Sequence, residues 1–195
     1  MSRPVIPEGT SDMRVSKEQA AKNRERILEA AARLMRERGI AGVGVDALAE
    51  AAGMTHGSLY SQFGSKERLV EEAVTYAIDA KGRELPEEFV LGDYVSEYLS
   101  KAHRDEPGSG CPFAALCSEI PRQGAAVRER FTAGVRGLIA LLSRRMESGL
   151  KPRQREDKAL ATAAFLIGAL VLARAVNDPK LSDDILRATR KELAE

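Results

Sequence analysis

Apolar and polar residues recur with helical spacing along the first part of the chain. After Ser16 the apolar side chains lie three and four residues apart, which places them in one stripe, while arginine and lysine mostly occupy the other faces. Ser16 followed by Gln19 has the spacing of a capping box, and Gly39 is a typical stop signal. The pattern predicts a long amphipathic helix whose buried stripe contains Ile27, Ala30, Ala31, Leu34 and Met35.

Shorter helical units follow this first helix. Residues 45–52 suit a two-turn helix that ends at Gly53. Thr55 or His56 begins a second short helix, which a further glycine ends. Ser65 is then a suitable N-cap for a third and longer helix.

The remainder of the chain is also helical in pattern. Proline and glycine clusters divide it into segments of helical length, and no convincing β-branched alternation occurs anywhere. The sequence therefore predicts an all-α protein with about nine helices. The later ones are expected at about residues 89–103, 112–121, 125–149, 154–176 and 182–194.

Composition narrows the classes of function. The 195 residues contain 30 Lys and Arg against 29 Asp and Glu, a net charge of +1, so any nucleic-acid-binding surface must be local. No Trp and 5% aromatic residues argue against a surface that stacks on bases. Two cysteines and two histidines, far apart in sequence, predict neither a disulfide framework nor a metal site.

The longest apolar run covers residues 159–173. Fifteen helical residues span roughly 22 Å, less than the roughly 30 Å of a bilayer core. The N-terminus also lacks the apolar segment of a signal peptide. We expect a soluble, cytoplasmic protein without a membrane partner.

Residues 45–63, VDALAEAAGMTHGSLYSQF, have the pattern of a helix-turn-helix. Gly53 suits a turn that needs positive φ, and Leu48, Met54 and Leu59 supply apolar contacts between the two helices. The second helix exposes short polar groups suited to base edges and phosphates. A helical corner inside an enzyme would show a similar pattern, so spacing alone leaves both interpretations open.

The run 44–73, GVDALAEAAGMTHGSLYSQFGSKERLVEEA, resembles the DNA-binding domain of the TetR family of bacterial repressors. The resemblance extends over about residues 17–82. It implies that Tyr60 and Lys66 contact phosphates and that Phe63 belongs to the small core. Two positions depart from the family pattern: Gly44-Val45 replaces the usual hydroxyl residue that opens the first motif helix, and Gln62 replaces a common histidine.

The resemblance and the motif together predict the residues that contact DNA. His56 has a second interpretation, because a helix-start histidine can simply be exposed and hydrated. The candidate DNA contacts are Val45, Thr55, His56, Ser58, Tyr60, Ser61, Gln62 and Lys66.

The resemblance also implies a domain organisation. Residues 1–15 are expected to form a flexible tail, 16–64 the DNA-binding domain, 65–84 a connecting helix and 85–195 a ligand-binding and dimerisation domain. The candidate pocket residues are Tyr94, Tyr98, Phe113, Leu116, Cys117, Phe131 and Phe165, although large side chains of this kind are more often plain core than ligand contacts. No charged residue interrupts their apolar stripes, which predicts an apolar or weakly polar ligand.

The apolar run 159–173 carries apolar residues around its whole circumference, which indicates burial on more than one face. One face can pack within the protomer while another meets a second copy around a two-fold axis. A central helix in a monomer is the alternative. The candidate interface residues are Ala164, Gly168, Val171, Leu172, Ile185 and Leu186.

The two cysteines occupy different settings. Pro112 is favoured at the first position of a helix, which places Cys111 at the N-cap, where the helix dipole lowers a thiol pKa. Gly110 is expected to leave this thiol accessible. Cys117 lies roughly 240° further around a helix, so the two cannot form a bridge within it, and it is expected to be a small buried hydrophobe. Some TetR-like regulators carry a Gly-Cys at a similar place and respond to electrophiles or oxidants. Cys111 is thus either such a sensor or a structural residue.

The sequence therefore predicts a ligand-responsive repressor that binds a palindromic operator as a homodimer. A small-molecule inducer, for which a thiol-reactive compound is one candidate, is expected to release it from DNA. No nucleophile–base pair, phosphate loop or cofactor fingerprint supports an enzyme, and no cofactor is expected. His103 has no partner cluster for a metal or catalytic role. An activator of the same family and a thiol-redox regulator are the alternatives.

Overall fold

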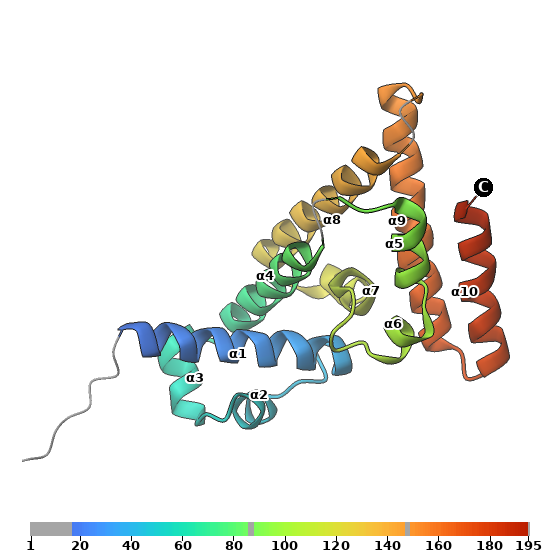
Figure 1. Cartoon of the computed structure of the whole chain (residues 1–195). Coiled ribbons are helices and arrows are strands. Elements are labelled where there is room, and N and C mark those ends of the chain that lie inside the picture. Colours follow the sequence, from blue (N-terminus) through green and yellow to red (C-terminus); the bar gives the residue numbers. More distant parts are fainter. Residues whose placement is uncertain (1–16, 86–87, 147–148, 195) are drawn as a thin grey trace, which may run out of the picture.

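The computed structural model describes residues 17–85, 88–146 and 149–194, and the predicted tail at 1–15 lies outside them. The described part contains ten α-helices, one 3-10 helix and no strand (Figure 1). The predicted all-α class is therefore confirmed. The expected count of about nine helices is close to the ten observed.

Four helices build the N-terminal half: α1 (Lys17–Arg38), α2 (Val45–Ala52), α3 (His56–Phe63) and α4 (Lys66–Glu84). Figure 1 shows α2 and α3 on one side of α1, while α4 leads away towards the rest of the molecule. Apolar side chains from all four helices meet in one core, which includes Ile27, Met35, Leu48, Leu59, Phe63 and Leu69. This core holds α3 at a fixed angle to α2.

Three glycines end helices in this half, as the sequence predicts. Gly39, Gly53 and Gly64 have φ values of 77°, 63° and 76°, and they are the only described residues with positive φ. A side chain with a Cβ is strained in this region, so glycine permits each tight turn.

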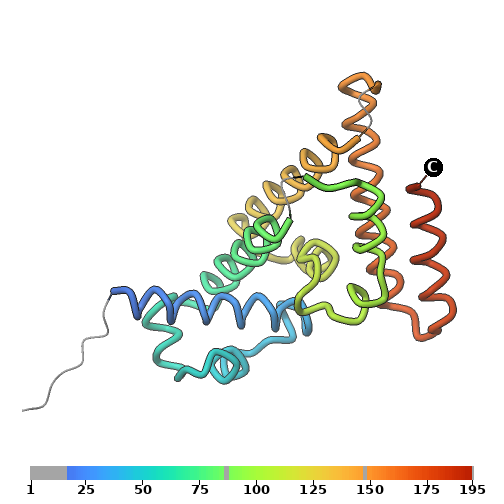
Figure 2. Tube along the Cα trace, in the orientation of Figure 1, coloured from blue at the N-terminus to red at the C-terminus, as the bar shows by residue number. Residues whose placement is uncertain are grey.

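The C-terminal half continues as α5 (Leu91–Tyr98), α6 (Lys101–Asp105), α7 (Pro112–Leu116), the 3-10 helix η1 (Ile120–Arg122), α8 (Ala125–Arg145), α9 (Pro152–Ala175) and α10 (Pro179–Ala194). The Cα trace shows α8 alongside α4 and the long α9 running between α8 and α10 (Figure 2). A second core lies among these helices and includes Tyr98, Leu99, Leu142, Leu166, Leu170 and Leu186.

Three expected helices are shorter than predicted, and one of them, 125–149, ends at Arg145 as α8. The segment 89–103 divides into α5 and α6, because the Ser100 side chain accepts a hydrogen bond from the backbone N–H of His103 (3.1 Å) and starts a new helix. The segment 112–121 stops after α7, and Pro121 instead lies within η1.

Candidate functional site

The turn between α2 and α3 has the geometry of a helix-turn-helix. Gly53 adopts the left-handed conformation, and the backbone N–H of Met54 donates to the carbonyl of Ala49 at 2.8 Å. Thr55 is the N-cap of α3, where its hydroxyl oxygen accepts from the N–H of Ser58 at 3.3 Å. These local contacts set the direction in which α3 leaves the turn.

The eight predicted DNA contacts lie on α2, on α3 and its N-cap, and at the start of α4, and α3 contacts both of the other helices. Thr55, His56, Tyr60 and Ser61 are exposed on α3 or at its start. Val45, Ser58, Gln62 and Lys66 are partly buried beside them. We call these eight residues the α3 surface. Figure 1 shows α3 at the edge of the molecule, on the side of α1 away from α8.

Asp46, an acidic residue next to the α3 surface, was not among the predicted DNA contacts. The Nε2 atom of His56 lies 2.9 Å from Oδ1 of Asp46 in α2, and the His56 ring meets the Tyr60 ring edge-on at 6.2 Å. The imidazole is therefore positioned by two neighbours. Asp46 is almost fully exposed, and it lies ten positions before His56 in the chain, so only the folded turn reveals the pair.

The C-terminal end of α3 is anchored by Arg24 of α1. Its guanidinium donates to the backbone carbonyl of Gln62 at 2.6 Å and stacks over the Phe63 ring at 4.2 Å from the centroid. It also pairs with Glu72 of α4. One side chain thus connects three helices, and it keeps α3 from rotating about its own axis.

Gly44 stands where the family pattern has a hydroxyl residue, and α2 lacks a side-chain cap as a result. Gly44 is the N-cap of α2, and no side chain caps the helix there. A Cβ at this position would meet nothing within 4 Å, so the space for a hydroxyl residue is present.

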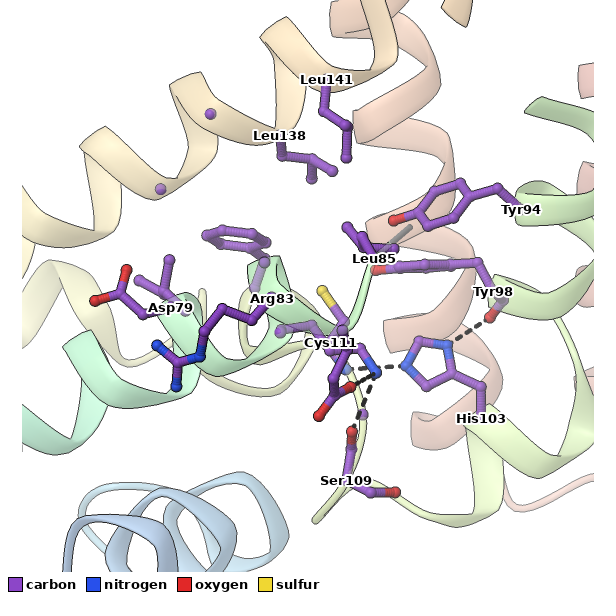
Figure 3. A pocket seen from close by; sticks show the side chains of 18 of the residues that line it. Asp79, Arg83, Leu85, Tyr94, Tyr98, His103, Ser109, Cys111, Leu138 and Leu141 are labelled. Atoms are coloured by element: carbon purple, nitrogen blue, oxygen red, sulfur yellow. Dashed lines mark hydrogen bonds and ion pairs between the residues drawn. The ribbon is translucent and has the colours of Figure 1, made fainter. Parts of the chain in front are cut away.

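A cavity of about 1000 Å³ lies among α4, α5, α7 and α8 (Figure 3). Three of the seven predicted pocket residues, Tyr94, Tyr98 and Phe113, line it. Gly134 and Gly137 of α8 also line it. At Gly134 a Cβ would lie 2.9 Å from Ile78, so this glycine permits the close approach of α8 to α4.

The other four predicted pocket residues lie elsewhere. Leu116 is buried in the N-terminal core, and Phe131 packs edge-on behind Phe113 with ring centroids 5.3 Å apart. Cys117 caps the end of α7 outside the cavity and is only half-buried. Phe165 is 50% exposed on the outer face of α9. These four residues do not line this cavity, because helix spacing does not indicate which face of a helix meets it.

His103 has a structural role that sequence analysis missed. Its Nε2 accepts from the backbone N–H of Cys111 (2.9 Å), so Nδ1 carries the proton and donates to the Tyr98 carbonyl (2.7 Å). Burial lowers the pKa of His103, which favours this neutral ring. Arg174 completes the arrangement by donating to the His103 carbonyl at 2.6 Å.

Cys111 is the N-cap of α7, as predicted, but its thiol is not open to solvent. The residue is 5% exposed, and Figure 3 shows its sulfur directed into the cavity. The expectation that Gly110 would leave it accessible is wrong, because His103 and Arg174 cover that glycine. The cavity therefore gives access to the sulfur.

The long helix α9 has two apolar faces. Its inner face packs against α8 and α10, while Leu160, Phe165 and Leu172 on the outer face are 46%, 50% and 56% exposed. The predicted interface residues Ala164 and Leu172 are exposed, and Gly168, Val171 and Ile185 are partly buried. We call Leu160, Ala164, Phe165, Gly168 and Leu172 the α9 outer face.

Leu186 was predicted to lie in the dimer interface, but the structure buries it within the protomer. It is 1% exposed and belongs to the core of its own protomer, because α10 turns this side towards α9. Beside it, the Ser182 hydroxyl donates to the Ala173 carbonyl at 2.6 Å and fixes the register of the two helices.

By length and composition alone, α9 could cross a membrane. Its inner face packs against α8 and α10 in this fold, and the core helix of a soluble protein meets the same criteria. This is weak evidence for a membrane span.

Comparison with known proteins gives a family match in the N-terminal half. Residues 27–73 match the family described as bacterial regulatory proteins, tetR family. An uncharacterised HTH-type transcriptional regulator of Mycobacterium tuberculosis is 27% identical over 183 residues, which cover 87% of this chain and 93% of that protein. The HTH-type transcriptional repressor NemR of Escherichia coli is 29% identical over 135 residues, which cover 65% of this chain and 68% of NemR.

Solved structures show the same fold over nearly the whole chain. The reduced form of E. coli NemR superposes with a TM-score of 0.71 at 25% identity, covering 88% of this chain and 95% of that one. A TetR-family regulator from Agrobacterium tumefaciens superposes with a TM-score of 0.70 at 23% identity, covering 89% of this chain and 98% of that one.

A helix-turn-helix with an exposed polar second helix, carried on a larger helical body, defines a DNA-binding transcriptional regulator. The family match, the relatives and the structural neighbours agree on the family of regulator. Together they support a TetR-family transcriptional regulator, which confirms the resemblance seen in the sequence. Members of this family are soluble, bind operator DNA and act as dimers, and the family is one of regulators rather than of enzymes.

Proposed function

We propose that this chain is a ligand-responsive repressor without catalytic activity, which binds a palindromic operator as a homodimer. The observation that carries the proposal is the α3 surface, where exposed polar side chains project from a helix that the N-terminal core and Arg24 hold rigidly. The repressor name of the E. coli relative supports the direction of control. A gel-shift assay with the DNA upstream of the chain's own gene tests it, and absence of a specific complex would contradict it.

Induction follows from the position of the cavity. It lies among α4, which leads to the DNA-binding helices, and α5, α7 and α8 of the C-terminal half. A ligand that stabilises one arrangement of these helices would change the separation of the two α3 helices in a dimer. Operator binding then falls only if the two arrangements bind DNA differently.

Lys66 and His56 are expected to differ in their contributions to DNA binding. Lys66→Ala should weaken binding to all sequences and reduce the salt dependence by about one phosphate contact, because a phosphate contact carries no sequence information. His56→Ala should instead change operator preference. Binding is measured by fluorescence anisotropy on operator and unrelated DNA over a range of salt concentrations.

The matched control is Lys191→Ala, which removes an exposed lysine from α10, far from α3 (Figure 1). It should bind both DNAs as the wild type does. If His56→Ala and Lys66→Ala lower binding to operator and unrelated DNA by the same factors, the assigned roles are wrong.

We also propose that Cys111 is a thiol sensor within the cavity. Alkylation of its sulfur would place a new group between α7 and Tyr98 and disturb the hydrogen bond that Cys111 N–H donates to His103. In the test with iodoacetamide, the thiolate displaces iodide and forms a thioether.

Iodoacetamide should release operator from the wild type and from Cys117→Ser, but not from Cys111→Ser. Filling the cavity by Gly137→Leu should slow alkylation of Cys111, since both residues line this space. Release that persists in Cys111→Ser would leave Cys111 as a purely structural residue.

A further inference from the structure

The hydroxyl of Tyr98 is buried without a hydrogen-bond partner among the described residues. Tyr98 is 6% exposed, and Figure 3 shows its hydroxyl directed into the cavity from α5. The Cys111 thiol lies beside it, and sulfur is only a weak acceptor. A buried hydroxyl without a partner costs about 1–3 kcal/mol. This group is therefore available to bind a molecule in the cavity.

The Tyr98 ring is held firmly in one position. The His103 ring contacts it edge-on at 4.7 Å, and the Tyr94 ring packs on it at 5.8 Å. His103 is itself held by its two hydrogen bonds. Burial raises the pKa of Tyr98, so the hydroxyl keeps its proton and acts as a donor.

The charged residues that line the cavity do not favour a charged ligand. Asp79 pairs with Arg130, and Lys81 pairs with Glu84 at 2.9 Å. The other charged lining residues are two cations and two anions, all exposed: Arg83, Arg144, Glu97 and Glu106. The charges of the lining residues therefore balance.

The space in front of the Tyr98 hydroxyl has apolar walls. Phe113 of α7 and Leu138 and Leu141 of α8 line it. Gly137 adds open space on the same helix, since a Cβ there would meet nothing within 4 Å. Apolar walls around one fixed donor are typical of sites that bind an apolar molecule in a defined orientation.

We infer that the ligand is an uncharged, mainly apolar molecule with a carbonyl-type oxygen that accepts a hydrogen bond from Tyr98. The inference rests on the proposed ligand-responsive function and names the chemical class that the cavity recognises. Bound in this way, the carbonyl supplies the partner that the hydroxyl lacks, and the rest of the molecule contacts Phe113 and Leu138.

A pair of probes of similar shape tests this directly. 2-Acetylnaphthalene carries the carbonyl oxygen, whereas 2-isopropylnaphthalene has a methyl group in its place. Each is titrated by calorimetry into the full-length wild type and into Tyr98→Phe. Tyr76→Phe, which removes the hydroxyl of an α4 tyrosine that does not line the cavity, is the matched control.

The acetyl probe should bind Tyr98→Phe about fivefold more weakly than the wild type, the size expected for one hydrogen bond between uncharged groups. The isopropyl probe should bind both proteins equally, and Tyr76→Phe should bind both probes as the wild type does. Tyr98→Phe should also unfold at a temperature no lower than the wild type, because it removes an unpaired buried hydroxyl. Gly137→Leu should weaken binding of both probes.

Equal binding of the acetyl probe to wild type and Tyr98→Phe would overturn the assignment of Tyr98. Binding of neither probe to the wild type would overturn the ligand class. Operator binding is measured by gel shift on the same preparations, so a wild type that binds DNA but fails the probe test contradicts only this inference. Failure to bind any operator contradicts the proposed function instead.

Discussion

Gly168→Trp is expected to convert a dimer into monomers and to lower operator affinity by about 10²- to 10⁴-fold, the usual gain from linking two binding modules. Gly168 lies in the α9 outer face, and a Cβ there would meet nothing within 4 Å inside the protomer. The protomer can therefore accommodate the indole, whereas a closely packed partner helix cannot. Ala164→Arg should act similarly by placing a charge in the same interface.

The measurements are light scattering for the oligomeric state and fluorescence anisotropy for operator binding. Gly92→Trp is the matched control, because Gly92 is an exposed helical glycine on α5 with the same open space around its Cα. It should remain a dimer. A wild type that is monomeric at micromolar concentration, or a Gly168→Trp variant that stays dimeric, would remove the basis for the proposed interface.

Glu119→Ala is expected to reduce stability by about 2 kcal/mol, since both oxygens of this carboxylate accept hydrogen bonds from backbone N–H groups. Oε1 accepts from Ile40 at 3.1 Å and Oε2 from Ala41 at 2.9 Å. Ile40 is buried, so its N–H loses a partner that water does not easily replace. For a chain of this size the unfolding temperature should fall by about 4–8 °C.

Calorimetry measures this change, with Glu129→Ala as the control, because Glu129 is exposed on α8. The unfolding temperature of Glu119→Gln should lie between those of Glu119→Ala and Glu129→Ala, since its amide retains one acceptor oxygen. Equal unfolding temperatures for Glu119→Ala and Glu129→Ala would show that the two hydrogen bonds contribute nothing to stability.

The same carboxylate connects the two halves of the protein. Glu119 follows α7, whose first residues line the cavity, and it holds the loop between α1 and α2. Arg36 of α1 makes a second connection by donating to the Gly108 carbonyl at 2.7 Å. Variants at Glu119 that remain folded are therefore expected to respond less to inducer.

The local rules of helix formation predicted much of the N-terminal half. Gly53 was expected to need positive φ and has it. Thr55 or His56 was expected to open α3, and the structure has Thr55 as its N-cap and His56 as its first residue. These features depend on neighbours within four residues, so they are visible in the sequence. The pairing of His56 with Asp46 is different, because it depends on the angle between α2 and α3.

The cavity was harder to predict than the helices around it. Tyr94, Tyr98 and Phe113, three of the predicted pocket residues, line it, but the sequence did not distinguish Phe165 and Leu116 from them. All five are large apolar side chains on helices. Which face of a helix meets a cavity depends on the crossing angles of several helices, and one helix's spacing carries no information about them.

The amino-acid order alone therefore contained the all-α class, the helix-turn-helix and the resemblance to the TetR family, because each rests on contacts between near neighbours in the chain. Tertiary packing was needed for the features that join distant residues. It brought Glu119 to Ile40 across 79 positions, turned Leu186 inward and Phe165 outward, and left the Tyr98 hydroxyl unpaired in a cavity. An apolar helix such as α9 has no polar stripe that marks its outer side, so only the packing of its neighbours decides which face stays exposed.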